Sequence, residues 1–370
     1  MKRRDFLAAA GVGSAALLAG CTVQRDDAGG AGGDGGRGTT TGSSDGDGDE
    51  LVVATYGAFV DAPSSSPGPW LKRRFESEFD ATLTWETPED GVNYYIERAS
   101  RGVEIDADAY VGLDTDMLLR IDENLDDDLF APVEDGTLDR RGDVKEGLEF
   151  DPRGRVVPYD TGYISLVYDE TDEVAPETFD GLLRPEFEGD LLTQNPTTSS
   201  TGKAFLLHTI KAKGGDGYLD YWRGLKENDV RVLGTWEDSY AAYSNDEAPM
   251  VVSYSTDQVY ANEEGEDLAE HRIRFLSGQG YANPEGMARF AASGNVELAN
   301  RFMDFVLRPD VQAEIAVRNV QFPATDAAEL PEDFERYAKE PDEPVTFTYE
   351  ELRGNVDGWT EGWAREFASK

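Results

Sequence analysis

The sequence contains very few residues of the kinds that cross-link a chain or bind metal ions. Its 370 residues include one cysteine, Cys21, and two histidines, His208 and His271. A single cysteine excludes an intramolecular disulfide. The histidines lie far apart and neither belongs to a ligand pattern such as a His-Glu-x-x-His helix, so we expect no metal site. We predict that His208 is a hydrogen-bonded histidine in an apolar helix and that His271 is exposed.

Basic residues are also scarce. The chain has 34 Lys and Arg against 75 Asp and Glu, which gives a formal net charge of -41. The acidic residues are spread along the chain and do not form one tail, which argues against nucleic acid as a partner. An even acidic excess is typical of a surface that stays hydrated in concentrated salt, where repulsion is screened within ~3 Å, so we predict a halophilic source. Most carboxylate pairs are therefore expected on solvated faces.

The apolar stretch near the N-terminus, residues 6–20, is shorter than the ~20 residues that span a bilayer as a helix. It follows Arg3 and Arg4 and ends in Leu18-Ala19-Gly20-Cys21. This order resembles a twin-arginine lipoprotein signal over residues 1–21. It predicts export and lipid attachment at Cys21, which would anchor the protein to the outer face of the cell membrane.

Residues 22–50 consist mainly of Gly, Ser, Thr and Asp, with almost no large apolar side chain. Such a segment cannot bury enough apolar surface to offset the entropy lost on ordering. We therefore predict a disordered tether.

The remaining part, about 320 residues, exceeds the size at which a single core stops growing, which predicts two domains. Its beginning alternates between strand and helix patterns, which favours a parallel or mixed sheet covered by helices. The expected strands are 51–56, 81–85 and 107–113, and the expected helices are 70–79 and 92–101.

An apolar and aromatic segment, 156–169, is expected to cross into a second α/β lobe, and the chain is expected to cross back near 272–290. This predicts a lobe 1 formed by 51–158 and 285–370, a lobe 2 formed by 159–284, and a cleft between them. Within lobe 2 we expect strands at 191–193 and 250–254 and helices at 204–212 and 218–225, and on lobe 1 paired helices at 300–307 and 311–316.

Aromatic and hydroxyl residues gather at the predicted loops and strand ends. Tyr56 closes the first strand, Asp90-Gly91 lies at a strand-to-helix turn, Trp236 lies in a loop, and the segment Tyr254–Tyr260 leaves a buried strand. Aromatic faces attract a cation by ~0.5 to 2 kcal/mol each. Together with a carboxylate, they suit a flat, cationic, nitrogen-rich ligand.

Hydroxyl residues also precede the apolar helix at 204–212. Ser199 and Ser200 lie where a helix cap is expected, and free backbone N–H groups at a helix start can bind an anion. Capping is the more frequent role of such residues, and the two roles can coexist.

No catalytic constellation is evident. Phosphate-loop and dinucleotide fingerprints are missing, and nothing assembles a nucleophile, a base and an orienting group. We therefore expect a protein that is not an enzyme and that needs no cofactor.

At these residues the sequence resembles the periplasmic thiamine-binding proteins of ABC importers, from about Leu51 to the C-terminus. The resemblance implies the two-lobed type II solute-binding fold, with α/β lobes and two crossings, and a monomer that delivers thiamine or a thiamine phosphate to a membrane permease. It rests on Thr55-Tyr56, Pro67-Gly68-Pro69, Glu89-Asp90-Gly91-Val92, Val111-Gly112-Leu113-Asp114, Pro158-Tyr159-Asp160-Thr161-Gly162-Tyr163, Thr198-Ser199-Ser200-Thr201-Gly202, Trp236-Glu237-Asp238-Ser239-Tyr240 and Ser253-Tyr254-Ser255-Thr256.

The resemblance also implies roles for individual residues. Trp236 and the tyrosines would stack on the ligand rings, Asp90 or Asp257 would complement its cation or amino group, and Ser199-Ser200 would hold its hydroxyl or phosphate end. Val320 replaces an aromatic residue of the family. The implied ligand-binding residues are Tyr56, Asp90, Gly91, Ser199, Ser200, Trp236, Tyr254, Ser255, Thr256, Asp257 and Tyr260.

Two alternatives remain open. Relatives of this fold bind ferric iron or polyamines, and Tyr94-Tyr95 resembles a pair of iron-binding tyrosines, although helical periodicity favours a packing role for the pair. A secreted thiamine-degrading enzyme would need an activated nucleophile, usually a cysteine. The only cysteine, Cys21, is expected to carry the lipid.

Overall fold

The computed structural model describes residues 49–62, 65–172 and 174–368. The predicted signal, with Arg3, Arg4 and Cys21, and residues 22–48 of the predicted tether lie outside these residues. The first strand begins at Asp49, so Asp49 and Glu50 belong to the sheet and the tether prediction was wrong at this end. In the described part of the chain, no helix is long and apolar enough to cross a membrane.

The predicted alternation of strands and helices at the start of the folded part is confirmed. β1 pairs in parallel with β2 on one side and with β3 on the other. Leu71 and Phe75, one helical turn apart in α3, are buried, and Asp114 caps α5 by accepting a hydrogen bond from the backbone N–H of Met117. These elements are β1 (Asp49–Ala54), α2 (Gly57–Asp61), α3 (Gly68–Glu78), β2 (Ala81–Glu86), α4 (Val92–Ser100), β3 (Ala109–Leu113) and α5 (Thr115–Asn124).

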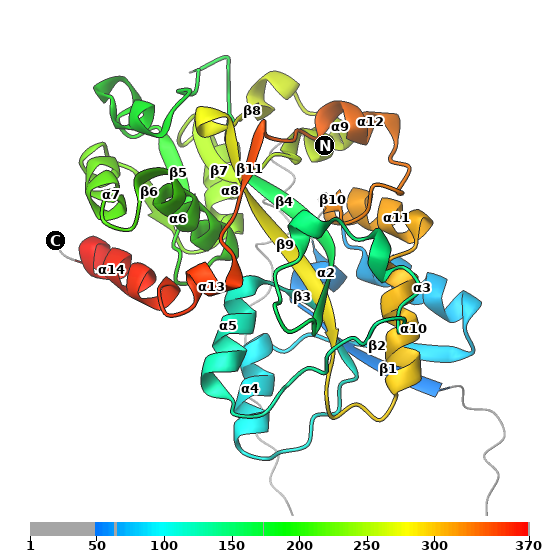
Figure 1. The fold of residues 1–370 in the computed structure, drawn as a ribbon. Coiled ribbons are helices and arrows are strands. Elements are labelled where there is room, and N and C mark those ends of the chain that lie inside the picture. The colour runs from blue at the N-terminus through cyan, green and yellow to red at the C-terminus, as the bar shows by residue number, and fades with distance from the viewer. Residues whose placement is uncertain (1–48, 63–64, 173, 369–370) are drawn as a thin grey trace, which may run out of the picture. The chain divides into compact units, whose positions relative to one another are not determined.

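Two long antiparallel strands, β4 (Val156–Tyr168) and β9 (Gln279–Arg289), lie in the middle of one mixed sheet (Figure 1). β9 pairs with β3 of the first part of the chain, and β4 pairs with β7 (Met250–Tyr254) of the second. The strand order is β2-β1-β3-β9-β4-β7-β5-β6. The two predicted crossings are thereby confirmed as β4 and β9.

The second part of the chain also alternates between helices and strands, as predicted. Trp236 was expected in a loop, but it is the first residue of a helix, because the Thr235 hydroxyl accepts a hydrogen bond from the backbone N–H of Asp238. Its remaining elements are β5 (Leu191–Gln194), α6 (Ser200–Lys213), α7 (Tyr218–Glu227), β6 (Arg231–Leu233), α8 (Trp236–Ser244), α9 (Asp257–Glu264) and β8 (Arg272–Arg274). Short 3₁₀ turns lie at Arg141–Asp143, Glu146–Leu148, Phe179–Leu183, Pro185–Phe187, Leu268–His271 and Leu276–Gly278.

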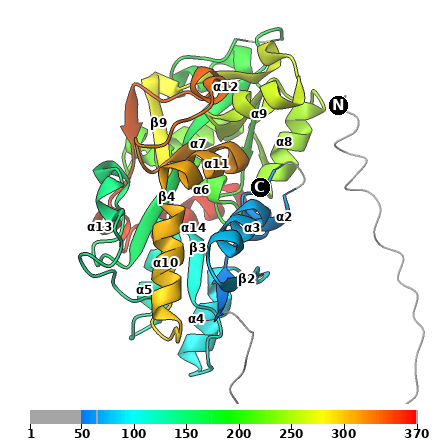
Figure 2. The ribbon, with the colours of Figure 1, turned by 90° about the vertical axis from the view of Figure 1, so that its right-hand side faces the viewer.

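The C-terminal part begins with the two predicted helices, α10 (Val296–Val306) and α11 (Pro309–Asn319). α10 lies beside α3 (Figure 2). The rings of Phe75 in α3 and Phe302 in α10 have centroids 5.5 Å apart. Five further elements follow: β10 (Phe322–Pro323), α12 (Glu332–Tyr337), β11 (Glu343–Val345), α13 (Tyr349–Leu352) and α14 (Val356–Ala368).

The helices that follow α11 pack against both parts of the chain. α12 contacts α9 and α14 contacts α7, and both partners lie within the predicted lobe 2. α13 contacts α5 of the predicted lobe 1. The assignment of all residues 285–370 to lobe 1 therefore does not match the packing of α12 and α14, and the lobe limits stay a proposal.

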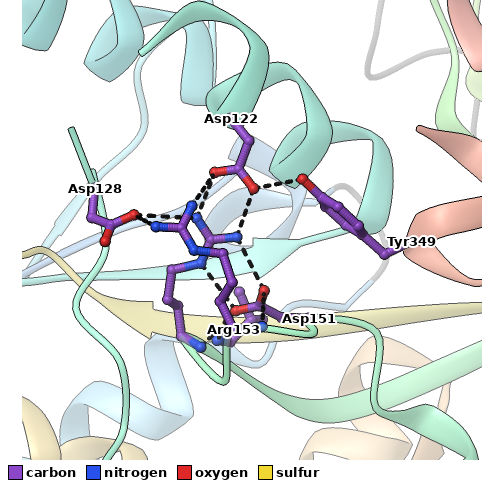
Figure 3. A network of polar contacts seen from close by, with 7 residues as sticks. Asp122, Asp128, Asp151, Arg153 and Tyr349 are labelled. Carbon is purple, nitrogen blue, oxygen red and sulfur yellow. Dashed lines mark hydrogen bonds and ion pairs between the residues drawn. The ribbon is translucent and has the colours of Figure 1, made fainter. Parts of the chain in front are cut away.

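The buried side chain of Arg155 is the centre of a hydrogen-bond and ion-pair network between segments that lie far apart in the sequence. The Arg155 side chain is fully buried and donates hydrogen bonds to Asp122 at 2.5 and 2.8 Å and to Asp151 at 3.0 Å. Tyr349 donates a further hydrogen bond of 2.7 Å to Asp122, and Asp122 also pairs with Arg153 (Figure 3). The network joins α5, the start of β4 and α13.

Candidate functional site

The site is built on the two crossing strands. Asp160 of β4 lies directly opposite Glu285 of β9, and Gly162 lies opposite Asn283. Because side chains alternate along a strand and opposite residues face the same way, these four positions share one face of the sheet. Asp160 is completely buried and Glu285 is partly buried.

A β-bulge places two side chains of β4 against one side chain of β9. The register shifts between Pro158 and Asp160, so Tyr159 is the extra residue and both Tyr159 and Asp160 oppose Glu285. The Tyr159 hydroxyl donates a 2.6 Å hydrogen bond to Oε2 of Glu285, and the Tyr56 hydroxyl donates one of 3.0 Å to the same oxygen. One oxygen of Glu285 therefore has two phenol donors.

Asp160 has fewer partners than Glu285. Its Oδ2 accepts a 2.7 Å hydrogen bond from the side-chain amide of Asn319, the last residue of α11. Its buried Oδ1 has no hydrogen-bond partner among the described residues. The Oδ1 atom of Asn319 lies 3.4 Å from the Tyr56 hydroxyl, so Asn319 contacts both Asp160 and Tyr56.

The site is acidic. Burial, followed by the charge of Glu285, raises the pKa of Asp160 well above its usual range. Burial also raises the pKa of Glu285, against the effect of its two tyrosine hydrogen bonds. Nearby, burial and the charge of Asp116 raise the pKa of Asp114 to about 6. Among the ion pairs of the described residues, no Lys or Arg contacts Asp160 or Glu285, so the chemistry of this site suits a ligand that carries positive charge.

Two tyrosines of the predicted site lie at these strands, each against a glycine. A Cβ atom on Gly162 would lie 2.4 Å from a ring carbon of Tyr254, and one on Gly112, which has φ +93°, would lie 2.5 Å from the ring of Tyr56. Only glycine permits these close approaches. The Tyr254 hydroxyl lies 3.5 Å from both Asn283 Nδ2 and Thr201 Oγ1. Burial raises the pKa of Tyr254 to about 12, so its hydroxyl stays protonated and neutral.

The start of α6 reaches the same site. Ser199 is the N-cap residue and its hydroxyl accepts a 3.3 Å hydrogen bond from the backbone N–H of Gly202, which confirms the capping role. Ser200 is exposed, and the following Thr201 contacts Tyr254. An anion role for Ser199 and Ser200 stays a prediction.

Trp236 and Asp257 belong to a second cluster, packed around Tyr240. The rings of Trp236 and Tyr240 are stacked, with centroids 4.8 Å apart, and the Trp236 indole N–H donates a 3.0 Å hydrogen bond to Ser253. Asp257 accepts a 2.7 Å hydrogen bond from Tyr240 on Oδ1, and its Oδ2 lies 2.8 Å from Nδ1 of His271. Both oxygens of Asp257 therefore have protein partners, and its role toward a ligand stays a prediction.

The two histidine predictions were wrong in different ways. His271, expected to be exposed, is 3% exposed, and its Nε2 lies 2.8 Å from Glu266. The charged residues beside it in the sequence suggested a surface position, but its two ring nitrogens instead bridge two carboxylates. His208 is buried in α6 as expected, but its Nε2 has no hydrogen-bond partner among the described residues. Burial lowers the pKa of His208 to about 3, so the ring is neutral.

The other predicted ligand residues have varied surroundings. Asp90 is exposed, and Gly91, with φ +53°, precedes α4 close to the Tyr110 hydroxyl. Ser255 and Thr256 are buried. Tyr260 is partly buried on α9. Among the described hydrogen bonds, none joins these residues to Asp160 or Glu285, so their roles stay predictions.

The paired tyrosines considered as iron ligands have a packing role, as the helical periodicity predicted. Tyr95 is 1% exposed, packs against Phe290 with ring centroids 4.8 Å apart and donates a 2.7 Å hydrogen bond to Glu86. Tyr94 contacts Arg98. In the described residues, no group of three or more His, Cys, Asp or Glu side chains is arranged to hold a metal ion.

Two surface hollows of about 590 Å³ each lie elsewhere, and no predicted ligand residue lines either of them. The first is lined by Val174, Ala175, Pro176, Glu177, Thr178, Asp180, Gly181, Arg184, Glu186, Phe187 and Arg274. The second is lined by Gly189, Lys226, Asp229, Val230, Arg231, Val232 and Phe367.

The fold, with two crossing strands between two α/β parts, is that of the two-lobed periplasmic binding proteins of type II. A solved structure described as a periplasmic thiamin binding protein superposes with a TM-score of 0.72 at 28% identity, covering 86% of this chain and 96% of that one. The ferric iron-binding protein A of Mannheimia haemolytica has a TM-score of 0.68 at 16% identity, covering 86% and 98%, and shares the fold.

Sequence comparison agrees. The thiamine-binding periplasmic protein of Salmonella typhimurium is 30% identical over 316 residues, which are 85% of this chain and 92% of that protein. The Escherichia coli protein of the same name gives the same identity and coverage. The family model of bacterial extracellular solute-binding proteins matches residues 121–342. The chain belongs to this family, and the resemblance found in the sequence is confirmed.

Proposed function

We propose that this protein is the solute-binding component of an ABC importer and captures thiamine or a phosphate ester of thiamine between its two lobes. The observation that carries the proposal is that Tyr56 and Tyr254 both lie beside the carboxyl pair of β4 and β9. A flat cation such as the thiazolium ring suits aromatic faces beside unpaired carboxylates. The 30% identity to thiamine-binding proteins over most of both chains supports the same ligand.

The remaining predicted residues complete the proposed site. Trp236 stacks on a ring of the ligand, and Asp90 or Asp257 complements its amino group or cation. Ser199 and Ser200, at the start of α6, hold the hydroxyl or phosphate end, where backbone N–H groups and the helix dipole favour negative charge. Gly91, Ser255, Thr256 and Tyr260 line the rest of the site.

The proposed location follows from the N-terminal sequence. The chain leaves the cytoplasm by twin-arginine export, is lipidated at Cys21 and works as a monomer on the outer face of the membrane of a halophile. From there it delivers the ligand to a permease in the same membrane. It binds and releases its ligand unchanged, without acting as an enzyme.

The ligand can be identified directly. Protein purified at high salt without denaturation is expected to release thiamine or a thiamine phosphate, detected by mass spectrometry, and the emptied protein is expected to bind thiamine in calorimetry. Ferric citrate serves as the competing ligand. A visible tyrosine-to-iron absorption band together with no heat from thiamine would replace this proposal with iron binding.

A further inference from the structure

The strand register brings two carboxyl groups together, and no Lys or Arg among the described residues forms an ion pair with either of them. Asp160 and Glu285 are direct partners across an antiparallel pair, where Cβ atoms lie about 4.5 to 5.5 Å apart. Asp160 is 0% exposed. A fully buried and a partly buried carboxylate at such a separation do not both ionise readily, because burial and their mutual repulsion both disfavour the second negative charge.

The hydrogen bonds of the pair distinguish its two members. Glu285 receives two O–H donors on one oxygen, an arrangement that favours its ionised form. Asp160 receives one N–H donor, from Asn319, and its Oδ1 is buried without a partner among the described residues. A proton shared by the pair therefore belongs on Asp160.

The groups that surround the pair are neutral or acidic. Four tyrosines and one carboxyl group lie near the pair, each on a different element. They are Tyr56 at the N-cap of α2, Tyr110 of β3, Tyr159 of β4, Tyr254 of β7 and Asp114 at the N-cap of α5. Burial raises the pKa of each of the four tyrosines, which keeps their hydroxyls protonated.

We propose that Asp160 carries a proton in the ligand-free protein and releases it to solvent when the cationic ring of the ligand binds beside Asp160 and Glu285. The exchange breaks the carboxyl O–H bond of Asp160, and the proton binds to a water molecule or a buffer base; no other bond changes. The pair has one negative charge before binding, and the pair with its bound monovalent cation has one negative charge afterwards. This inference rests on the proposed thiamine-class ligand, because it requires a permanent positive charge on the bound molecule.

The exchange makes the site selective for charge. When a neutral molecule of the same shape binds, Asp160 keeps its proton, because no positive charge offsets the repulsion between two ionised carboxylates. Binding of the cation strengthens as the pH rises through the range in which Asp160 is protonated, by up to tenfold per pH unit. Binding of a neutral analogue does not strengthen as the pH rises.

The first test needs no ligand. Infrared spectroscopy of the free protein near neutral pH is expected to show the C=O stretch of a protonated carboxylic acid, which disappears in Asp160→Asn. The exposed, ion-paired Asp180 provides the matched control, and Asp180→Asn is expected to keep the band. Absence of the band in the unchanged protein overturns the proposal, whatever the ligand is.

The second test counts protons. Calorimetric titration with thiamine in two buffers of different ionisation enthalpy, at a pH where the ligand itself does not titrate, is expected to report release of about one proton. A deaza analogue with a neutral ring is expected to release none. Asp160→Asn is expected to bind thiamine at least tenfold more weakly and to release no proton, and Glu285→Gln serves as the second variant if Asp160→Asn does not fold.

The outcomes separate the two proposals. Binding of thiamine without proton release, with the same heat in both buffers, overturns the exchange and leaves the thiamine function intact. Failure of thiamine to bind, while the infrared band of Asp160 is present, overturns the proposed function and keeps the protonated pair.

Discussion

The indole of Trp236 lies on the phenol ring of Tyr240, with centroids 4.8 Å apart and ring planes 25° apart. Tyr240 in turn donates its hydroxyl proton to Asp257, which contacts His271. One face of Trp236 is therefore already in contact with the protein. In the proposed site, a ligand ring would have to stack on the other face of Trp236.

Trp236→Ala is expected to weaken thiamine binding at least tenfold, about 1.4 kcal/mol, because the site loses an aromatic face. Calorimetry at high salt measures the change. The matched control is Trp359→Ala, a partly buried tryptophan on α14 that packs on Phe347. It should bind thiamine with unchanged affinity. Equal affinities for Trp236→Ala and the unchanged protein would remove Trp236 from the site.

Gly112→Ala is expected to displace the Tyr56 ring and to lower thiamine affinity at least fivefold, because the new Cβ would lie 2.5 Å from the ring. Gly102→Ala is the control: Gly102 also has a positive φ, +64°, but no atom lies within 4 Å of an added Cβ. Both variants should lose about 1 to 2 kcal/mol of stability from backbone strain, measured by denaturation. Only the first should lose affinity, and a parallel loss in both would contradict the steric argument.

His271 is expected to make folding stability depend on pH. Burial alone would lower its pKa, but hydrogen bonds to Asp257 and Glu266 and their charges raise the pKa to about 9. A pKa above the usual value of about 6.5 stabilises the fold below that pH, and this contribution, up to about 3 kcal/mol, is lost as the pH rises through about 9. Urea denaturation at high salt, at about pH 6.5 and 9.5, measures the loss.

Two variants isolate this effect. His271→Gln should lack the pH-dependent contribution, so its stability should approach that of the unchanged protein as the pH rises. His208→Gln should keep the pH dependence of the unchanged protein, because His208 is neutral over the whole range. If the unchanged protein and His271→Gln differed in stability by the same amount at both pH values, His271 would not be the source of the pH dependence.

Arg155→Met is expected to destabilise the fold by about 3 to 5 kcal/mol, because it leaves the fully buried Asp151 without its cation and leaves Asp122 with only the half-exposed Arg153. Arg153→Met tests the neighbouring arginine, which contacts Asp122 and Asp128 but is 47% exposed, and should cost less than about 1 kcal/mol. Chemical denaturation measures both. Similar losses in the two variants would show that burial does not determine the strength of this network (Figure 3).

Much of the fold could be predicted because its patterns are local. The β-branched and apolar run at 156–169 gave β4 almost to the residue, and apolar spacing gave α3, α10 and α11. Trp236 was placed in a loop, although Thr235 followed by two acidic residues is a helix-start signal that could have located α8.

The centre of the site could not be predicted in this way. Asp160 and Glu285 are two of 75 acidic residues, most of which were expected on solvated faces. Their relationship depends on the pairing of strands that lie far apart in the sequence and on the bulge at Tyr159, which no local pattern specifies. The sequence signals for Asp160 were its place in the family-like segment 158–163 and the presence of a carboxylate inside an apolar strand, where an unpaired charge is costly.

The bulge at Tyr159 has a mechanical consequence. β4 and β9 pair with strands on both sides of the site, so any rotation of one lobe against the other must bend these two strands. A bulge is the point at which a strand bends most readily, and this one lies beside Asp160. A bend of β4 at this bulge would change the spacing of the two carboxyl groups. A permease that forced the lobes apart would thereby change the spacing of Asp160 and Glu285 without contacting either residue.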